Sequence, residues 1–251
     1  MEKVEGETGE AMNLILRSRS GVDKGDITQS AKRDAETVRP VVAALEEDIV
    51  LGRLHPRERL IEDDLMQRFE VKRHVVRQSL AELETMGIVE RIHNRGAFVR
   101  VYQATEIQQL YLVRDLLETH AARLIPVPLS KRDLNELKHV QMKHDKAVDG
   151  GKLGEVFHTN VEFHEVLFSK AGNPYLSEVI KQFAFRTHGI RFYCLTYPGY
   201  LQQVRREHWE MIEAIERCDR QSLVQLCSQH LLASRACYER AVHAVDSPQS
   251  K

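Results

Sequence analysis

Three histidines and one asparagine in the second half of the chain have the residue types and spacing of metal ligands. Asn160 and His164 are four positions apart in a stretch with helical periodicity, so their side chains lie on one face, one turn apart. His208 and His230 each share a face with aliphatic residues in two later helical stretches. Imidazoles that point into an apolar interior need partners, because an unpaired buried polar group costs about 1–3 kcal/mol. Three imidazole nitrogens and one oxygen suit a divalent ion, with zinc first and nickel or manganese as alternatives.

Spacing alone leaves a simpler interpretation of these histidines open. A buried histidine often does no more than form a hydrogen bond with a neighbouring side chain. Three other histidines of this region, His144, His158 and His188, and also Lys170, are assigned by default to the surface or to positions behind the ligands.

A second group of candidate residues is cationic and lies between Asp64 and Val99. A short helical pattern, a turn and a second amphipathic helix are followed there by two β-prone segments joined by a tight turn. This order predicts a winged helix-turn-helix, whose second helix enters the major groove of DNA with its N-terminal residues nearest the bases. The candidates for DNA contact are at that N-terminus and in the turn of the wing: Lys72, Arg73, His74, Arg77, His93, Asn94, Arg95 and Gly96.

Side-chain chemistry suggests which part of the DNA each of these residues would contact. Arg73 and Arg77 can hold guanine O6 and N7 with two hydrogen bonds, whereas Lys72 suits a phosphate. In the wing, Arg95 would bring charge to the minor groove and Gly96 would permit close backbone approach. Each charge could instead be an ordinary solvated one, but clustering at both recognition elements favours DNA binding. The net charge of the chain is only −1, so this positive face is local.

The elements that must hold these groups divide the chain into three parts. Residues 1–36 are polar and lack sustained periodicity, which predicts a flexible tail. Residues 37–102 are expected to form the winged helix-turn-helix domain, and residues 103–246 an all-helical antiparallel bundle. The fold class is therefore mainly α. The expected helices of the bundle span residues 105–125, 130–150, 153–171, 175–195, 200–217 and 220–245.

Composition indicates the cellular compartment of the protein. The four cysteines have no CxxC spacing, which indicates small apolar residues in a reducing compartment. The first ten residues are acidic rather than signal-like, and no apolar run approaches the length of a membrane span. We therefore expect a cytoplasmic protein without a membrane partner.

Three segments of the first domain resemble the GntR-type bacterial transcription regulators. They are residues 51–60 (LGRLHPRERL), 71–80 (VKRHVVRQSL) and 94–99 (NRGAFV). The departures from the usual residues are at Arg57, at Lys72 and at residues 74–76, and they concern the operator sequence rather than DNA binding itself. The family's DNA-contact positions that match here are Arg73, Arg77 and the wing around Gly96.

The second domain resembles the FCD effector domain of the FadR branch, in its six-helix, VanR-like form. The resemblance rests on Asn160, His164, His208 and His230, which follow the metal-binding pattern of that domain, although Asp is commoner than Asn at the first position. It also implies that Arg114 faces an effector cavity, where a guanidinium beside a metal suits a carboxylate. Arg186 is a further candidate for effector binding. Arg114 could instead form a surface ion pair with Glu118.

Together these features predict a homodimeric repressor that binds a palindromic operator in double-stranded DNA and responds to a small organic acid bound at the metal. Two alternatives remain. The metal site could be purely structural in the same regulator, or it could belong to a metal-dependent enzyme. Against the enzyme, the sequence has no HExxH-like motif and no general base placed beside the candidate ligands.

Overall fold

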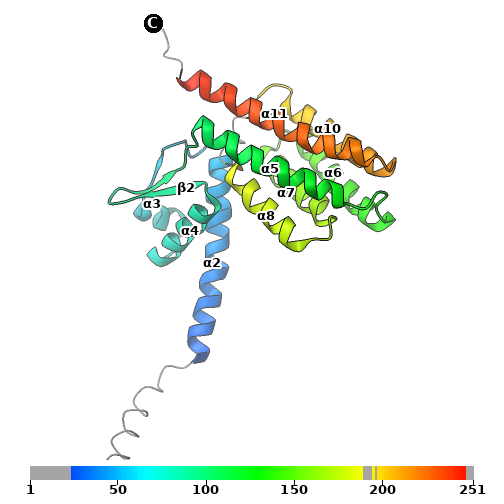
Figure 1. The fold of residues 1–251 in the computed structure, drawn as a ribbon. Coiled ribbons are helices and arrows are strands. Elements are labelled where there is room, and N and C mark those ends of the chain that lie inside the picture. The colour runs from blue at the N-terminus through cyan, green and yellow to red at the C-terminus, as the bar shows by residue number, and fades with distance from the viewer. Residues whose placement is uncertain (1–23, 189–193, 196, 247–251) are drawn as a thin grey trace, which may run out of the picture.

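The computed structural model describes residues 24–188, 194–195 and 197–246, with side chains described from residue 37 to residue 236 outside the same gaps. Its N-terminal part is a winged helix-turn-helix, shown in blue to cyan in Figure 1. The elements are α2 (Lys24–Val50), β1 (Arg59–Leu60), α3 (Glu62–Phe69), α4 (Arg73–Met86), β2 (Val89–Ile92) and β3 (Gly96–Val99). The strands form an antiparallel sheet in the order β1-β3-β2, with Val89 opposite Val99.

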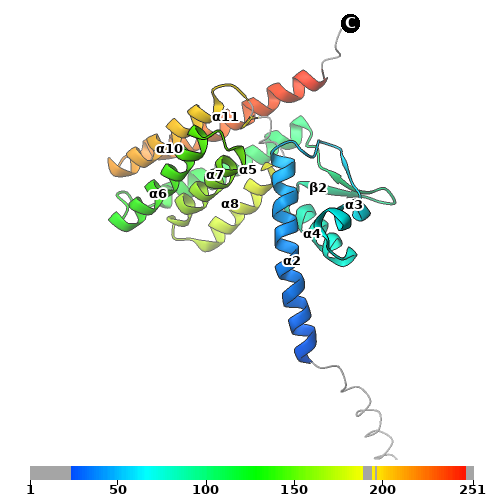
Figure 2. The same ribbon diagram turned by 180° about the vertical axis from the view of Figure 1, so that it is seen from behind.

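Helix α2 begins earlier than the sequence suggested. Residues 24–36, which we expected to belong to a flexible tail, continue the helix that carries the apolar stripe, and this half of α2 projects from the domain in Figures 1 and 2. The periodicity argument missed it because it detects only a helix with an apolar face to bury. Once the packed half of a helix has formed, adding further residues requires no new nucleation. Residues 1–23 lie outside the described part.

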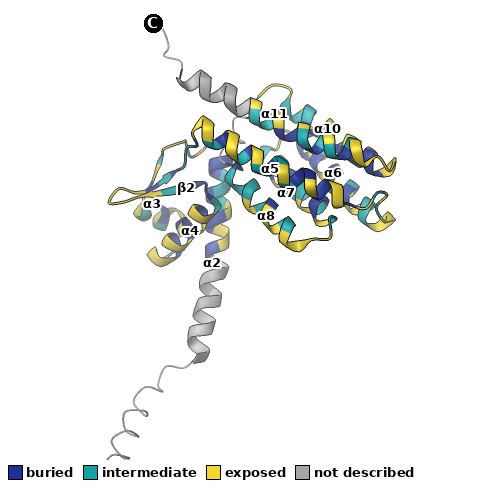
Figure 3. Cartoon of the chain, in the orientation of Figure 1, coloured by how far each residue is buried: buried dark blue, intermediate teal, exposed yellow. Residues whose placement is uncertain are grey.

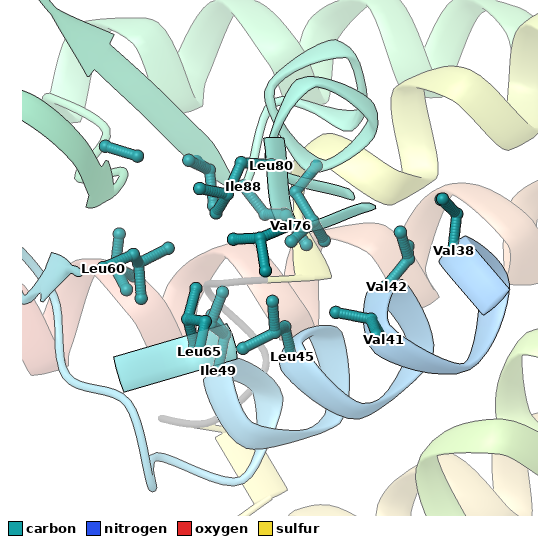
Figure 4. Packing of buried hydrophobic residues seen from close by; sticks show 14 of the residues in the cluster. Val38, Val41, Val42, Leu45, Ile49, Leu60, Leu65, Val76, Leu80 and Ile88 are labelled. Carbon is teal, nitrogen blue, oxygen red and sulfur yellow. The ribbon is translucent and has the colours of Figure 1, made fainter. Parts of the chain in front are cut away.

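The apolar stripe of α2 forms the core of this domain. Leu45 and Ile49 pack against Val76 and Leu80 of α4 and against Ile88, just before β2, as Figure 4 shows. All five side chains are at most 3% exposed. Helix α4 ends at Met86, and its C-cap Gly87 has φ 80° and adopts the expected left-handed conformation. This core fixes the orientation of α4 relative to the wing.

The C-terminal part is an all-helical bundle, as expected. Helix α11 packs along α5, α6 packs along α7, and α10 contacts both α6 and α11. Figure 3 shows that the inner faces of these helices are buried and the outer faces exposed. The helices are α5 (Ala104–Leu124), α6 (Lys131–Asp149), α7 (Leu153–Ser169), α8 (Pro174–Arg186), α10 (Tyr200–Glu216) and α11 (Arg220–Asp246). The mainly α fold class is confirmed, whereas the domain boundaries at residues 36 and 102 stay predictions.

One helix of the bundle is shorter than predicted. We expected a helix from Tyr175 to about residue 195, but α8 ends at Arg186 with Thr187 as its C-cap. Residues 188, 194 and 195 are again helical, and residues 189–193 of the predicted range lie outside the described part. The side chain of Thr187 donates a hydrogen bond to the carbonyl of Ala184 (2.8 Å), which satisfies a carbonyl of the last turn. None of the described helices is long and apolar enough to cross a bilayer.

Candidate metal centre and DNA-reading surface

The structure brings the three predicted histidine ligands together from three helices. His164 on α7, His208 on α10 and His230 on α11 each offer a nitrogen within 4.8 Å of the others. The Nε2 atoms of His164 and His230 are 3.1 Å apart. His208 and His230 are buried. Zn–N bonds of about 2.0–2.1 Å hold two donor nitrogens at most about 4.2 Å apart, and the pair at 3.1 Å already meets this limit.

Hydrogen bonds behind the histidines decide which nitrogen faces the shared centre. Nδ1 of His208 lies 2.8 Å from Oε1 of Gln141, and Nδ1 of His230 lies 2.6 Å from Oε2 of Glu207. Because both oxygens accept hydrogen bonds, both Nδ1 atoms donate, which leaves the lone pair on Nε2. This arrangement is the usual one behind metal-bound histidine.

These outer partners are themselves held in place. Gln141 donates from Nε2 to Oδ1 of Asp145 (2.8 Å), which keeps its Oε1 toward His208. Burial would raise the pKa of the Glu207 carboxyl, but the hydrogen bonds that it accepts from His230 and from Gln203 help to outweigh burial and hold that pKa below its ordinary value. Glu207 is therefore an anionic partner for the His230 ring.

Asn160, the fourth predicted ligand, lies one turn before His164 on α7 and is 7% exposed. Among the described residues its Nδ2 atom has no hydrogen-bond partner. Three converging imidazoles, of which His208 and His230 have the lone pair on Nε2, and one amide oxygen form a donor set that fits a borderline divalent cation such as zinc. These residues therefore fit the divalent metal ion that the sequence predicted.

A cavity of about 510 Å³ opens beside this centre, between α5, α7 and α8. His164 belongs both to the histidine triad and to the cavity wall. Apolar side chains provide much of the rest of the wall, and polar groups come from α5, α7 and α8. Residues that line it include Arg114, Glu118, Phe168, Ile180, Phe185 and His188.

Arg114 lies in the cavity wall, and its ion pair with Glu118 is also present. Its Nε donates to Oε1 of Glu118 (2.8 Å) and its Nη1 donates to the hydroxyl of Thr187 (3.0 Å). Burial disfavours the guanidinium charge, but Glu118 and then Tyr111 outweigh it, so the pKa of Arg114 is held above its usual value. Arg114 is thus a permanently charged group at the cavity and not a surface residue.

The assignment of Arg186 to effector binding needs correction. Arg186 is not among the residues that line the cavity. Its side chain instead approaches Gly87 at the end of α4, where an added Cβ would lie 3.0 Å from its Cγ. The periodicity of α8 could not show this, because the position depends on how the DNA-binding domain sits against the bundle.

Two histidines assigned by default to the surface or to outer positions are buried. His144 on α6 is fully buried, and the centroid of its ring lies 5.3 Å from that of His208. His188 is 1% exposed, and its Nδ1 lies 2.5 Å from Oε1 of Glu46 on α2. The signal for His144 was its place on the apolar face of α6. No sequence signal marked the contact between His188 and Glu46, since the two residues are far apart along the chain.

The predicted DNA-contact residues lie on the exposed surface of α4 and the wing. Lys72, at the N-cap of α4, makes no side-chain capping bond, and Arg73 and Arg77 follow on the same exposed face. The tip of the wing, residues 93–96, is exposed as well, and its Gly96 has φ 101°, which favours glycine. A groove of about 440 Å³ is lined by residues of both elements, among them Arg73 and Gly96.

Two carboxylates beside this surface were not anticipated. Arg73 contacts Glu62 (3.2 Å) and Asp63 (2.5 Å), and Arg77 contacts Glu62 (3.0 Å). Glu62 and Asp63 belong to the first turn of α3. In the sequence they are ordinary acidic residues at a helix N-terminus, and only the packing of α3 against α4 brings them to the arginines.

The fold is that of a winged helix-turn-helix regulator with an all-helical second domain. The family models agree: residues 37–99 match "Bacterial regulatory proteins, gntR family" and residues 109–233 match "FCD domain". The chain belongs to the GntR family of DNA-binding regulators and carries an FCD domain. Members of this family are not enzymes, so the enzymatic alternative is set aside.

Curated relatives and solved structures are consistent with this membership. The chain is 25% identical over 190 residues to the uncharacterized regulator YdhC of Bacillus subtilis, covering 75% of this chain and 83% of that protein. It is 21% identical over 187 residues to the repressor RspR of Escherichia coli, covering 74% of this chain and 82% of that protein. The structure of E. coli McbR/YncC has a TM-score of 0.71 at 20% identity, covering 82% of this chain and 98% of that one, which shows a shared fold.

Proposed function

We propose that this chain is a homodimeric repressor that binds a palindromic operator and is controlled by a small organic acid. The acid binds in the FCD cavity, against a divalent metal held by Asn160, His164, His208 and His230. The observation that carries the proposal is that His164 belongs to both the triad and the cavity wall. A ligand in the cavity would therefore reach the centre directly, which favours a sensing site over a purely structural one.

The cavity supplies two kinds of recognition for such a ligand. The bound ion would attract a carboxylate, and Arg114 would add a fixed positive charge with donors left over, because a guanidinium has five N–H groups and the two bonds described above use only part of them. Phe168, Ile180 and Phe185 offer apolar surface to the rest of the molecule. Small-molecule sites commonly combine a largely apolar wall with a few polar groups in this way.

The end of α8 offers a route from the cavity to the DNA-binding domain. Thr187 accepts the hydrogen bond of Arg114, and the next residue, His188, lines the cavity and contacts Glu46 of α2. A ligand that displaced either group would change the contact between the bundle and the helix whose other face forms the DNA-binding core. A coupling of about 1–3 kcal/mol between the two sites would be enough for control.

Exposed leucines support dimer formation through the bundle. Leu112 and Leu116 lie one turn apart on α5, and each is 63% exposed. Leu232, on the neighbouring helix α11, is 55% exposed. A surface of this kind would bury apolar area in a two-fold dimer, and such a dimer would present two copies of α4 to the half-sites of a palindrome.

The test uses the full-length protein. Its metal content is measured, thermal shift is screened against small carboxylates, and affinity is measured by fluorescence anisotropy for duplexes selected from a random pool. We expect a stoichiometric ion, a carboxylate that raises the melting temperature only in the metal-loaded protein, and an altered duplex affinity when that carboxylate is present. A protein that binds a selected duplex, holds no ion after loading and gives the same affinity with every carboxylate would contradict the proposal.

A further inference from the structure

His144 is the buried histidine of the bundle that the metal site leaves without a role. It lies on α6 beside His208, yet it is not one of the three residues whose donor atoms converge. Its Nε2 atom is buried and has no hydrogen-bond partner in the described part of the chain. Such an atom costs stability unless a partner is supplied.

The surroundings of His144 determine which of its nitrogens carries the proton. Nδ1 lies 3.1 Å from the hydroxyl oxygen of Thr159. That hydroxyl donates its own hydrogen to the carbonyl of Glu155, 2.6 Å away, so toward His144 it can only accept. Nδ1 of His144 therefore donates, and Nε2 keeps a lone pair that can only accept. Burial lowers the pKa of His144 to about 4, in keeping with a neutral ring.

A matching donor lies at the same small cavity. His144 and Asn160 both line a space of about 20 Å³, together with Tyr200 and apolar side chains. The Nδ2 group of Asn160 is buried and, among the described residues, has no partner. An acceptor and a donor thus share a space whose volume suits one water molecule, for which about 10–15 Å³ is needed.

We propose that His144 is a positioning residue for Asn160. One buried water accepts a hydrogen bond from Nδ2 of Asn160 and donates one to Nε2 of His144, and this link turns Oδ1 of Asn160 toward the histidine triad. The inference rests on the proposed metal site and adds to it a reason for the amide at position 160.

The need for such a residue follows from the chemistry of an amide. Only the oxygen of the Asn160 side chain can bind a cation, and a rotation of 180° would present the nitrogen instead. The two oxygens of a carboxylate are equivalent, so an aspartate at this position would bind in either orientation. His144 should therefore matter when residue 160 is asparagine and matter little when it is aspartate.

A double-mutant cycle on the full-length protein tests this difference. The affinity for Co²⁺ alone is measured by competition with a chelator for wild type, His144→Phe, Asn160→Asp and the double variant. We expect His144→Phe to weaken Co²⁺ binding by about 10–100-fold in the wild-type background, the usual effect of losing a residue that orients a ligand. In the Asn160→Asp background the same change should cost less than about threefold, since a carboxylate needs no orientation. Equal losses in both backgrounds, or no loss in the wild type, would overturn the inference.

Two further measurements keep the test decisive. His144→Gln, which can still accept a hydrogen bond, should retain most of the affinity. Nitrogen-15 NMR of the wild-type protein should show a protonated Nδ1 and an unprotonated Nε2 at His144, and the opposite tautomer would overturn the inference even if His144→Phe does not fold. A wild-type protein that binds no Co²⁺ contradicts the proposed function itself, whereas a binding protein with equal losses contradicts the role of His144 alone.

Discussion

The DNA-reading surface and the histidine centre use charged and polar side chains under opposite conditions. Arg73 and Arg77 have side chains that are 48% and 61% exposed, and each contacts a carboxylate of α3. His208 is fully buried and His230 is 7% exposed, and each donates to one defined oxygen. Both regions hold side chains in place, but the free energy needed to break their contacts differs greatly.

The contrast suits the two tasks. Exposed ion pairs contribute only about 0–1 kcal/mol, so Glu62 can hold the arginines without DNA and release them to it at little cost. Buried hydrogen bonds in low dielectric are costly to break, so the rings keep one tautomer and one orientation. A surface that must exchange partners and a centre that must keep its geometry therefore require different surroundings. Four substitutions test this comparison.

The largest effect is expected for His208→Ala. Removing one of three converging imidazoles should lower metal affinity by more than about 100-fold, beyond the effect typical of outer residues. The measurement is metal content by elemental analysis after dialysis. The control is His158→Ala on α7, whose side chain is 54% exposed and should not affect the metal. Stoichiometric metal in the His208 variant would contradict the assignment.

A smaller loss is expected for Arg77→Ala at the DNA surface. The free energy of operator binding should become less favourable by about 1–3 kcal/mol, the contribution of one good bidentate contact to a base. Anisotropy titrations against a selected duplex provide the measurement. The matched control is Arg217→Ala at the C-cap of α10 in the second domain, whose side chain pairs with Glu213 and is 75% exposed. An unchanged affinity and footprint would show that Arg77 is only a solvated charge.

Glu207→Gln tests the carboxylate behind the metal centre. The amide can still accept from His230 but carries no charge, so metal affinity should fall by about tenfold. Competition with a chelator measures the change, and Glu213→Gln on the exposed face of the same helix is the control. If both variants bind metal equally well, the charge of Glu207 has no part in the site.

Glu62→Gln tests the carboxylate beside the DNA surface and should have the smallest effect. Releasing Arg73 and Arg77 should tighten operator binding slightly, by about 0–1 kcal/mol. The gain should shrink as salt is raised, because exposed ion pairs are screened. Titrations at two salt concentrations measure it. A loss of affinity greater than tenfold would mean that Glu62 orients the arginines for DNA, which would remove the contrast with Glu207.

Local patterns predicted much of the fold. The helical stripe of α2, the amphipathic α4 with its Gly87 cap, and the hairpin of the wing each leave a signal within a few residues. The pairing of Asn160 with His164 could also be predicted from the sequence, because helical spacing alone puts them on one face. The sequence did not predict the extension of α2 to Lys24, because a helix without a buried face has no apolar periodicity. It did not predict the end of α8 at Arg186 either, because the end of a helix depends on local hydrogen bonds.

The sequence by itself determined which residue types lie on which face of each helix: the cations of α4 outward, and the histidines of α7, α10 and α11 inward. Only the tertiary structure decided what those faces meet. Gln141 and Glu207 stand behind the triad, Glu62 lies beside Arg77, and His188 meets Glu46 across the domain junction. The physical reason is that periodicity follows from the backbone geometry of one helix, whereas a hydrogen bond between helices depends on how they pack, and that depends on the whole core.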